Sequence, residues 1–131
     1  QEITETRDLI GANFTNCIID GNNNIEFLPD RVDGSLFNFK VANSLIKFID
    51  VNNTFVGISE VDFNDAGLYE NILLNGVSNF RNKSLNDFII GQNSQAINFG
   101  NSLGASLVPL DILEVTRSLN PDAGAYQHID F

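Results

Sequence analysis

Ser94-Gln95-Ala96-Ile97-Asn98-Phe99-Gly100 opens a series of three motifs that decides the expected fold. The second motif is Asp111-Ile112-Leu113-Glu114-Val115-Thr116-Arg117, and the third is Pro121-Asp122-Ala123-Gly124-Ala125-Tyr126-Gln127. One cation, Arg117, therefore stands between the carboxylates of Asp111 and Asp122. The glycines of these motifs suit positive φ angles or close backbone approach.

Short strand-like runs recur along the preceding part of the chain. The clearest begin with asparagine: Asn16-Cys17-Ile18-Ile19, Asn43-Ser44-Leu45-Ile46 and Asn71-Ile72-Leu73-Leu74. Their starts lie 27 and 28 residues apart, and self-similarity with a fixed period of this size indicates a solenoid. The β-branched and aromatic bias of the runs favours strands over helices. We therefore predict that Ile18, Leu45 and Leu73 stack in neighbouring coils of one parallel sheet.

The three C-terminal motifs resemble the signature of the choice-of-anchor Q group, bacterial surface proteins with a pectin-lyase-like fold. The group's pattern is roughly S-x-A-I-D-x-G, D-I-x-G-x-x-R and P-D-I-G-A-Y-E. This chain departs from it at Asn98, Glu114, Ala123 and Gln127. The resemblance implies an all-β fold, a right-handed single-stranded parallel β-helix of about four coils plus a C-terminal cap. The alternative that composition leaves open is an antiparallel β-sandwich built from short, regularly spaced strands.

The expected organisation is a single domain over residues 1–131, cut from a longer chain. Residues 1–92 form the coils, with an insertion near 52–68, and residues 93–131 form the capping motif. No helix is predicted. The predicted structural cap consists of Asp111, Arg117, Asp122, Gly124 and Tyr126. We expect Arg117 to pair with one of the two aspartates, and the Tyr126 ring to pack on the last coil.

Composition excludes several classes of partner. The net charge is -10 with seven basic residues in all, so the chain lacks the basic surface that nucleic acid requires. No apolar run reaches the length of a membrane span. Cys17 is the single cysteine, which excludes an internal disulfide. The 19 asparagines suit turns and left-handed corners and disfavour helices.

Candidate catalytic and metal-binding residues were weighed against structural roles. The run Asp20 to Glu26 offers oxygen ligands at the first, third and fifth positions of a calcium loop, but Ile25 and Arg31 occupy positions that should hold Gly and Glu. The acidic residues that could pair for polysaccharide cleavage are Asp50, Glu60, Asp62 and Asp65, and no spacing selects two of them. His128 lies near the chain end, and Cys17 lies in an apolar run. We therefore predict no catalytic, cofactor or metal residues, with calcium as the one cation considered.

The resemblance implies an extracellular or bacterial cell-surface location. The function it favours is a non-catalytic C-terminal module, structural or carbohydrate-facing. The expected partners are a polysaccharide or surface glycan, and the upstream part of the same polypeptide. Two alternatives remain open: a fragment of a polysaccharide lyase or glycoside hydrolase, and a surface adhesion module that binds a protein.

Overall fold

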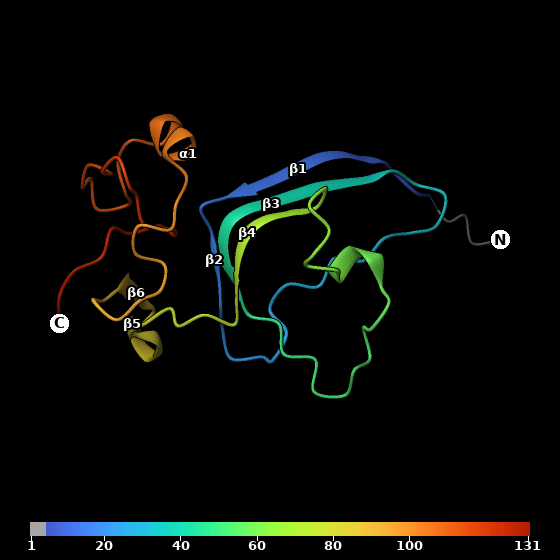
Figure 1. Ribbon diagram of the computed structural model, residues 1–131, viewed down its shortest axis with the longest axis horizontal. Helices are drawn as coiled ribbons and strands as arrows, with labels where there is room; N and C mark the ends of the chain where they lie inside the picture. The colour runs from blue at the N-terminus through green and yellow to red at the C-terminus, as the bar shows by residue number, and fades with distance from the viewer. Residues whose placement is uncertain (1–4) are drawn as a thin grey trace.

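A computed structural model describes residues 5–131 (Figure 1). Its strands are β1 (Leu9–Thr15), β2 (Ile18–Ile19), β3 (Phe37–Ile46), β4 (Tyr69–Leu74), β5 (Phe80–Asn82) and β6 (Asp87–Ile90). Its helical elements are the 3-10 turns η1 (Ser59–Val61) and η2 (Lys83–Leu85) and the short α-helix α1 (Ser102–Leu107). Irregular segments make up much of the remainder.

A parallel sheet forms the first half of the molecule. β3 pairs in parallel with β1 and β2 along one edge and with β4 along the other. Ile18 lies opposite Leu45, and Leu45 lies opposite Leu73. The register predicted from the spacing of the asparagine runs is therefore confirmed.

A row of asparagines bends this sheet. Asn16, Asn43 and Asn71 have positive φ angles of 58°, 49° and 54°. Asparagine tolerates the left-handed conformation because its short side chain forms local hydrogen bonds. One left-handed residue at the same place in each strand turns all the strands together, so the sheet has two arms that meet along this row (Figure 1).

The inside of the bend holds the main core. Val41 and Ile46 are fully buried there, beside Phe39 and Tyr69. Further rings join them in a continuous cluster, in which neighbouring centroids lie 4.7 to 6.1 Å apart. Phe14 belongs to β1 and Phe37 to β3, and the connecting loops supply Phe27, Phe48, Phe55 and Phe63. Edge-to-face aromatic pairs contribute about 0.5–1.5 kcal/mol each beyond area burial. The loops at 20–36 and 47–68 are thereby held against the sheet.

The predicted four-coil parallel β-helix is wrong. After β4 the chain forms an antiparallel hairpin, in which Phe80 of β5 faces Ile90 of β6. Only residues 83–86 connect these strands, and a parallel crossover needs about a dozen residues or more. The parallel sheet also stays open, because β1 and β4 each pair with β3 alone. The antiparallel pairing that a sandwich requires is limited to this hairpin and two isolated bridges among the described residues.

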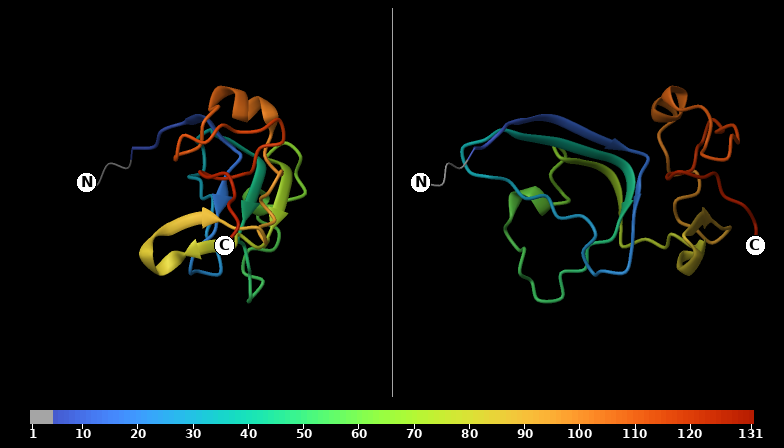
Figure 2. Two further views of the ribbon diagram at one scale, coloured as in Figure 1. Left: turned by 90° about the vertical axis from the view of Figure 1, so that its left-hand side faces the viewer. Right: turned by 180° about the vertical axis from the view of Figure 1, so that it is seen from behind.

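The C-terminal segment, residues 91–131, lies against the outer face of the arm formed by β2 and the ends of β3 and β4 (Figure 2). Ala96 and Ala123 are fully buried beside Ile90, and Ile18 of β2 packs against this small cluster. The segment contains α1, which the sequence did not predict. Its N-terminal turn is capped by the Asn101 side chain, which accepts hydrogen bonds from two backbone N–H groups. Within residues 5–131, no helix has the length and apolar character that crossing a membrane requires.

Candidate functional site

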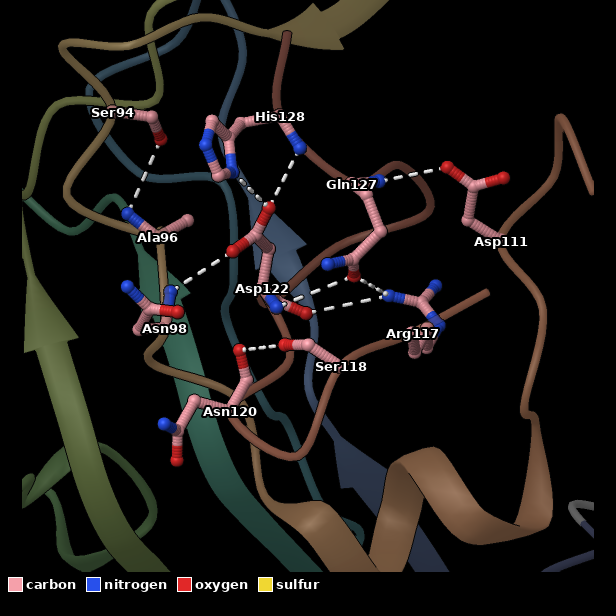
Figure 3. A network of polar contacts seen from close by, with 10 residues as sticks. All are labelled: Ser94, Ala96, Asn98, Asp111, Arg117, Ser118, Asn120, Asp122, Gln127 and His128. Atoms are coloured by element: carbon pink, nitrogen blue, oxygen red, sulfur yellow. Dashed lines mark hydrogen bonds and ion pairs between the residues drawn. The ribbon is translucent and has the colours of Figure 1, made fainter. Parts of the chain in front are cut away.

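Three of the predicted cap residues, Asp111, Arg117 and Asp122, lie together in a polar network within the C-terminal segment (Figure 3). Its centre is Asp122, which is 1% exposed. One carboxylate oxygen accepts the N–H of Asn98 at 2.9 Å. The other accepts the backbone N–H of His128 at 2.6 Å and contacts its ring Nδ1 at 2.8 Å. A single buried carboxylate thus ties three separate stretches of chain together.

Asp111 is the second buried carboxylate of the network. Oδ1 accepts the N–H groups of Leu113 and Val115 at 2.8 and 2.9 Å, and Oδ2 accepts the N–H of Gln127 at 2.8 Å. Burial acts to raise the pKa of Asp111, but these three N–H groups and the charge of Arg117 outweigh it, so the pKa lies below its ordinary value. The carboxylate holds a tight loop closed in its ionised form.

Arg117 bonds to backbone carbonyls in place of the expected carboxylate. It donates to the carbonyl oxygens of Asp122 at 3.3 Å and Gly124 at 2.9 Å, and to Oε1 of Gln127 at 3.0 Å. Within residues 5–131, Arg117 forms no ion pair with Asp111 or Asp122. The reason is that backbone N–H groups already occupy both carboxylates. The guanidinium instead satisfies carbonyls along the third motif.

Gly124 joins the network to the sheet. Its N–H donates to the carbonyl of Asn16 at 2.8 Å. Its φ angle is +104°, and a Cβ there would lie 2.8 Å from Cδ1 of Ile18. The positive φ angle therefore favours glycine, and any side chain here would also displace the end of the Ile18 side chain.

The asparagine row also binds the C-terminal segment. The Asn16 side chain donates to the carbonyl of Asn101 at 3.0 Å and accepts its N–H at 2.6 Å. The Asn43 side chain donates to the carbonyl of Phe99 at 3.3 Å. Asn98 itself has a positive φ of 56°. Two of the three asparagines that bend the sheet, Asn16 and Asn43, thus also fasten its outer face to the C-terminal segment.

A cleft of about 570 Å³ lies where β1 and β2 meet the hairpin and the C-terminal segment. Three rings line it, those of Phe80, Phe88 and Tyr126, beside Asp20 and aliphatic side chains. Tyr126 therefore lies near the first strands of the sheet, and not on a final coil as expected. Cys17 also lines the cleft. Burial raises the pKa of its thiol, which makes the nucleophilic thiolate scarce at neutral pH.

Two of the four acidic candidates for catalysis lie in the same cleft. Asp50 and Asp62 both line a second cleft of about 530 Å³. However, Asp50 accepts the N–H groups of Thr54 and Phe55, and Asp62 accepts the N–H of Asn64. These carboxylates organise turns.

The other two acidic candidates also have local partners. Glu60 pairs with Arg31 at 2.8 Å. The hydrogen bond from Ser59 is the main reason that the pKa of Glu60 is lowered. Asp65 accepts the N–H of Gly67 at 2.8 Å.

The candidate calcium loop, residues 20–26, uses its carboxylates for hydrogen bonds within the chain. Asp20 accepts the hydroxyl of Ser78, and Glu26 accepts the N–H of Asn23. Among residues 5–131, no group of three or more His, Cys, Asp or Glu side chains is placed to hold a metal ion.

Comparison with known proteins identifies no relative, because no family model, no curated protein and no solved structure matches the chain. Sequence reasoning found Asp111, Arg117 and Asp122 but missed the partners that complete the network: Asn16, Asn98, Asn101, Gln127 and His128. The spacing of the asparagine runs could have marked Asn16. The others carry no local signal, since their partners lie up to 85 residues away.

Proposed function

We propose that this chain is a non-catalytic structural module, in which the C-terminal segment clamps the outer face of a bent parallel sheet. One observation carries the proposal. The strongest polar groups of the terminal motifs, Asp111, Arg117 and Asp122, all bond to backbone groups of the same chain. Groups held in this way are occupied before any substrate arrives, whereas a catalytic acid or base needs a reachable proton.

The proposed setting is a secreted or cell-surface bacterial protein. Its support is the resemblance of the three motifs to the choice-of-anchor Q signature. Glu114 strengthens one part of that comparison, because the family has glycine there and Glu114 has a φ of +64°. In the same proposal the module is one part of a longer polypeptide, and the upstream part of that polypeptide is a partner.

Carbohydrate is the second candidate, as a ligand of the cleft between the sheet and the C-terminal segment. Phe80, Phe88 and Tyr126 supply rings on which sugar faces stack, and Asp20 supplies a carboxylate for hydroxyl groups. A neutral glycan fits better than an acidic one, because the chain carries a net charge of -10.

One experiment separates these functions from the enzymatic alternative. The chain is incubated with pectin, polygalacturonate, alginate and chondroitin, with and without calcium, and products are measured as reducing ends and unsaturated sugars. We expect no product. Reproducible turnover that Asp50→Asn or Asp62→Asn abolishes would identify a lyase or hydrolase and overturn the structural proposal.

Ligand binding is tested separately by titrating neutral oligosaccharides into the wild type and into Phe88→Ala. Phe88 is 41% exposed, so we expect Phe88→Ala to fold, and circular dichroism checks this before the titration. Leu119→Ala is the matched control, because Leu119 is 89% exposed and does not line the cleft. Binding that Phe88→Ala weakens and Leu119→Ala preserves supports a carbohydrate site. If no oligosaccharide binds, the structural role remains as the only proposed function.

A further inference from the structure

Among the described residues, one acidic side chain lines the cleft of about 570 Å³, that of Asp20, which directly follows β2. Its Oδ2 atom accepts the hydroxyl of Ser78. Within residues 5–131, the Oδ1 atom accepts no hydrogen bond, and the carboxylate forms no ion pair. The bond from Ser78 therefore fixes the orientation of this carboxylate and leaves one of its oxygens to a ligand.

Arg117 is the basic side chain that lines the cleft in the described part of the chain, and its charge is already balanced. The guanidinium donates to two backbone carbonyls and to Oε1 of Gln127. Burial acts to raise the pKa of Asp111, but backbone N–H groups and the charge of Arg117 outweigh it. Arg117 and Asp111 thus stabilise each other inside the C-terminal segment. The charge that lacks a partner in the cleft is the negative one of Asp20.

Lys47 is the cation beside the chain that follows Asp20. Its ammonium group donates to the carbonyl of Gly21 at 2.7 Å, and its side chain does not line the cleft. The carboxylate of Glu26 also lies against Gly21, because a Cβ added there would collide with it. The charges of Lys47 and Glu26 therefore offset each other outside the cleft.

Aromatic rings line the same cleft as Asp20. Phe80 and Phe88 of the hairpin form an edge-to-face pair with centroids 5.3 Å apart, and Tyr126 supplies a third ring from the C-terminal segment. The face of an aromatic ring attracts cations and also packs against the apolar face of a sugar. A carboxylate without a cationic partner, in a cleft lined by aromatic rings, is suited to a sugar that carries a positive charge.

We propose that this cleft binds amino sugars, with the protonated amine on Oδ1 of Asp20 and the sugar ring against the aromatic side chains. This inference rests on the proposed carbohydrate site and adds the class of sugar that the site takes. A charged ammonium donor bonds to a carboxylate about twice as strongly as a neutral hydroxyl does. Most side chains that line the cleft are apolar, so water screens this pair less than it screens a pair on an open surface.

The test compares two probes that differ in the amine alone, the β-1,4-linked tetramers of glucosamine and of N-acetylglucosamine. Each is titrated into the whole chain by isothermal calorimetry in mildly acidic buffer, in which the free amine is protonated. The glucosamine tetramer should bind the wild type about ten-fold more tightly or better. Equal affinity for the two tetramers would overturn the inference and leave a neutral sugar site. Failure of both tetramers to bind would overturn the carbohydrate site as well.

Asp20→Asn removes the charge and keeps an oxygen for the Ser78 hydroxyl. It should bind both tetramers with the same affinity. Asp30→Asn is the matched control, because it makes the same change at an exposed residue that does not line the cleft, and it should keep the preference of the wild type. An equal loss of preference in both variants would assign the effect to net charge and overturn the inference.

Two measurements on the wild type keep the test sharp if Asp20→Asn is poorly folded. Added salt should weaken binding of the glucosamine tetramer and leave that of the N-acetyl tetramer unchanged. The amide resonances of Asp20 and Phe88 should shift on titration with the glucosamine tetramer, and that of Asp30 should not. Shifts that occur at Asp30 and spare Asp20 would place the amine elsewhere and contradict the inference.

Discussion

The bent sheet and the C-terminal segment are stabilised by different means. The sheet buries Val41 and Ile46 completely and packs aromatic rings around them. The C-terminal segment buries fewer large apolar side chains, and its centre is the carboxylate of Asp122 with its N–H donors. Apolar packing tolerates small shifts of position, whereas a hydrogen-bonded carboxylate requires each donor in place. The sheet should therefore withstand acid better than the segment does.

The largest effect is expected in the sheet. Ile46→Ala removes a fully buried side chain at the inside of the bend and should lower the free energy of unfolding by about 4 kcal/mol. Urea denaturation followed by circular dichroism measures this loss. Ile112→Ala is the control, because Ile112 is 65% exposed, and its cost should stay below about 1 kcal/mol. Similar losses in both variants would mean that the aromatic cluster is not the core.

Asp122→Ala tests the segment in the same way. It leaves the backbone N–H groups of Asn98 and His128 without their acceptor and removes the contact of the His128 ring, and it should cost about 3 kcal/mol. His128→Ala removes one of these contacts and should cost less than about 1 kcal/mol, because its side chain is 40% exposed. A loss for Asp122→Ala no larger than that for His128→Ala would contradict the clamp.

The segment should also show the stronger pH dependence. The pKa of Asp111 is lowered in the folded state, so the carboxylate contributes stability above its ordinary pKa of about 3.9, and this contribution disappears as pH falls through the lower folded-state value. Asp111→Asn should therefore be less stable at pH 7 and should lose less stability between about pH 4 and pH 2. Identical slopes for variant and wild type in acid titrations of stability would refute this assignment.

The smallest expected effect is a gain. Glu114 has a φ of +64° in the loop that Asp111 closes, and glycine adopts this conformation without strain. Glu114→Gly should raise stability by about 1 kcal/mol. Glu114→Ala distinguishes relief of backbone strain from loss of the negative charge, because alanine removes the charge but is strained at this φ angle as glutamate is. An equal gain in both variants, measured by thermal denaturation, would assign the effect to charge.

The sheet was more predictable from sequence than the segment was. In a parallel sheet, residues that lie opposite each other recur at a fixed spacing along the chain. The spacing of Asn16, Asn43 and Asn71 therefore predicts the register. The hairpin breaks that repeat, because residues 83–86 are too few for a parallel crossover between β5 and β6. In the segment, the charged residues were identified, but their partners were not. A charged residue can be recognised in a sequence. The backbone N–H group that bonds to it cannot, because nearly every residue has one.

Amide hydrogen exchange of the wild-type chain tests the clamp most directly. The account predicts strong protection at Leu45 and Lys47 in the sheet, and comparable protection at Asn98, Gln127 and His128, whose N–H groups bond to buried carboxylates. Asn13 and Thr15, whose N–H groups point away from β3, should exchange faster than their neighbour Phe14. Exchange at Asn98, Gln127 and His128 as fast as in an unfolded chain, beside a protected sheet, would contradict the account.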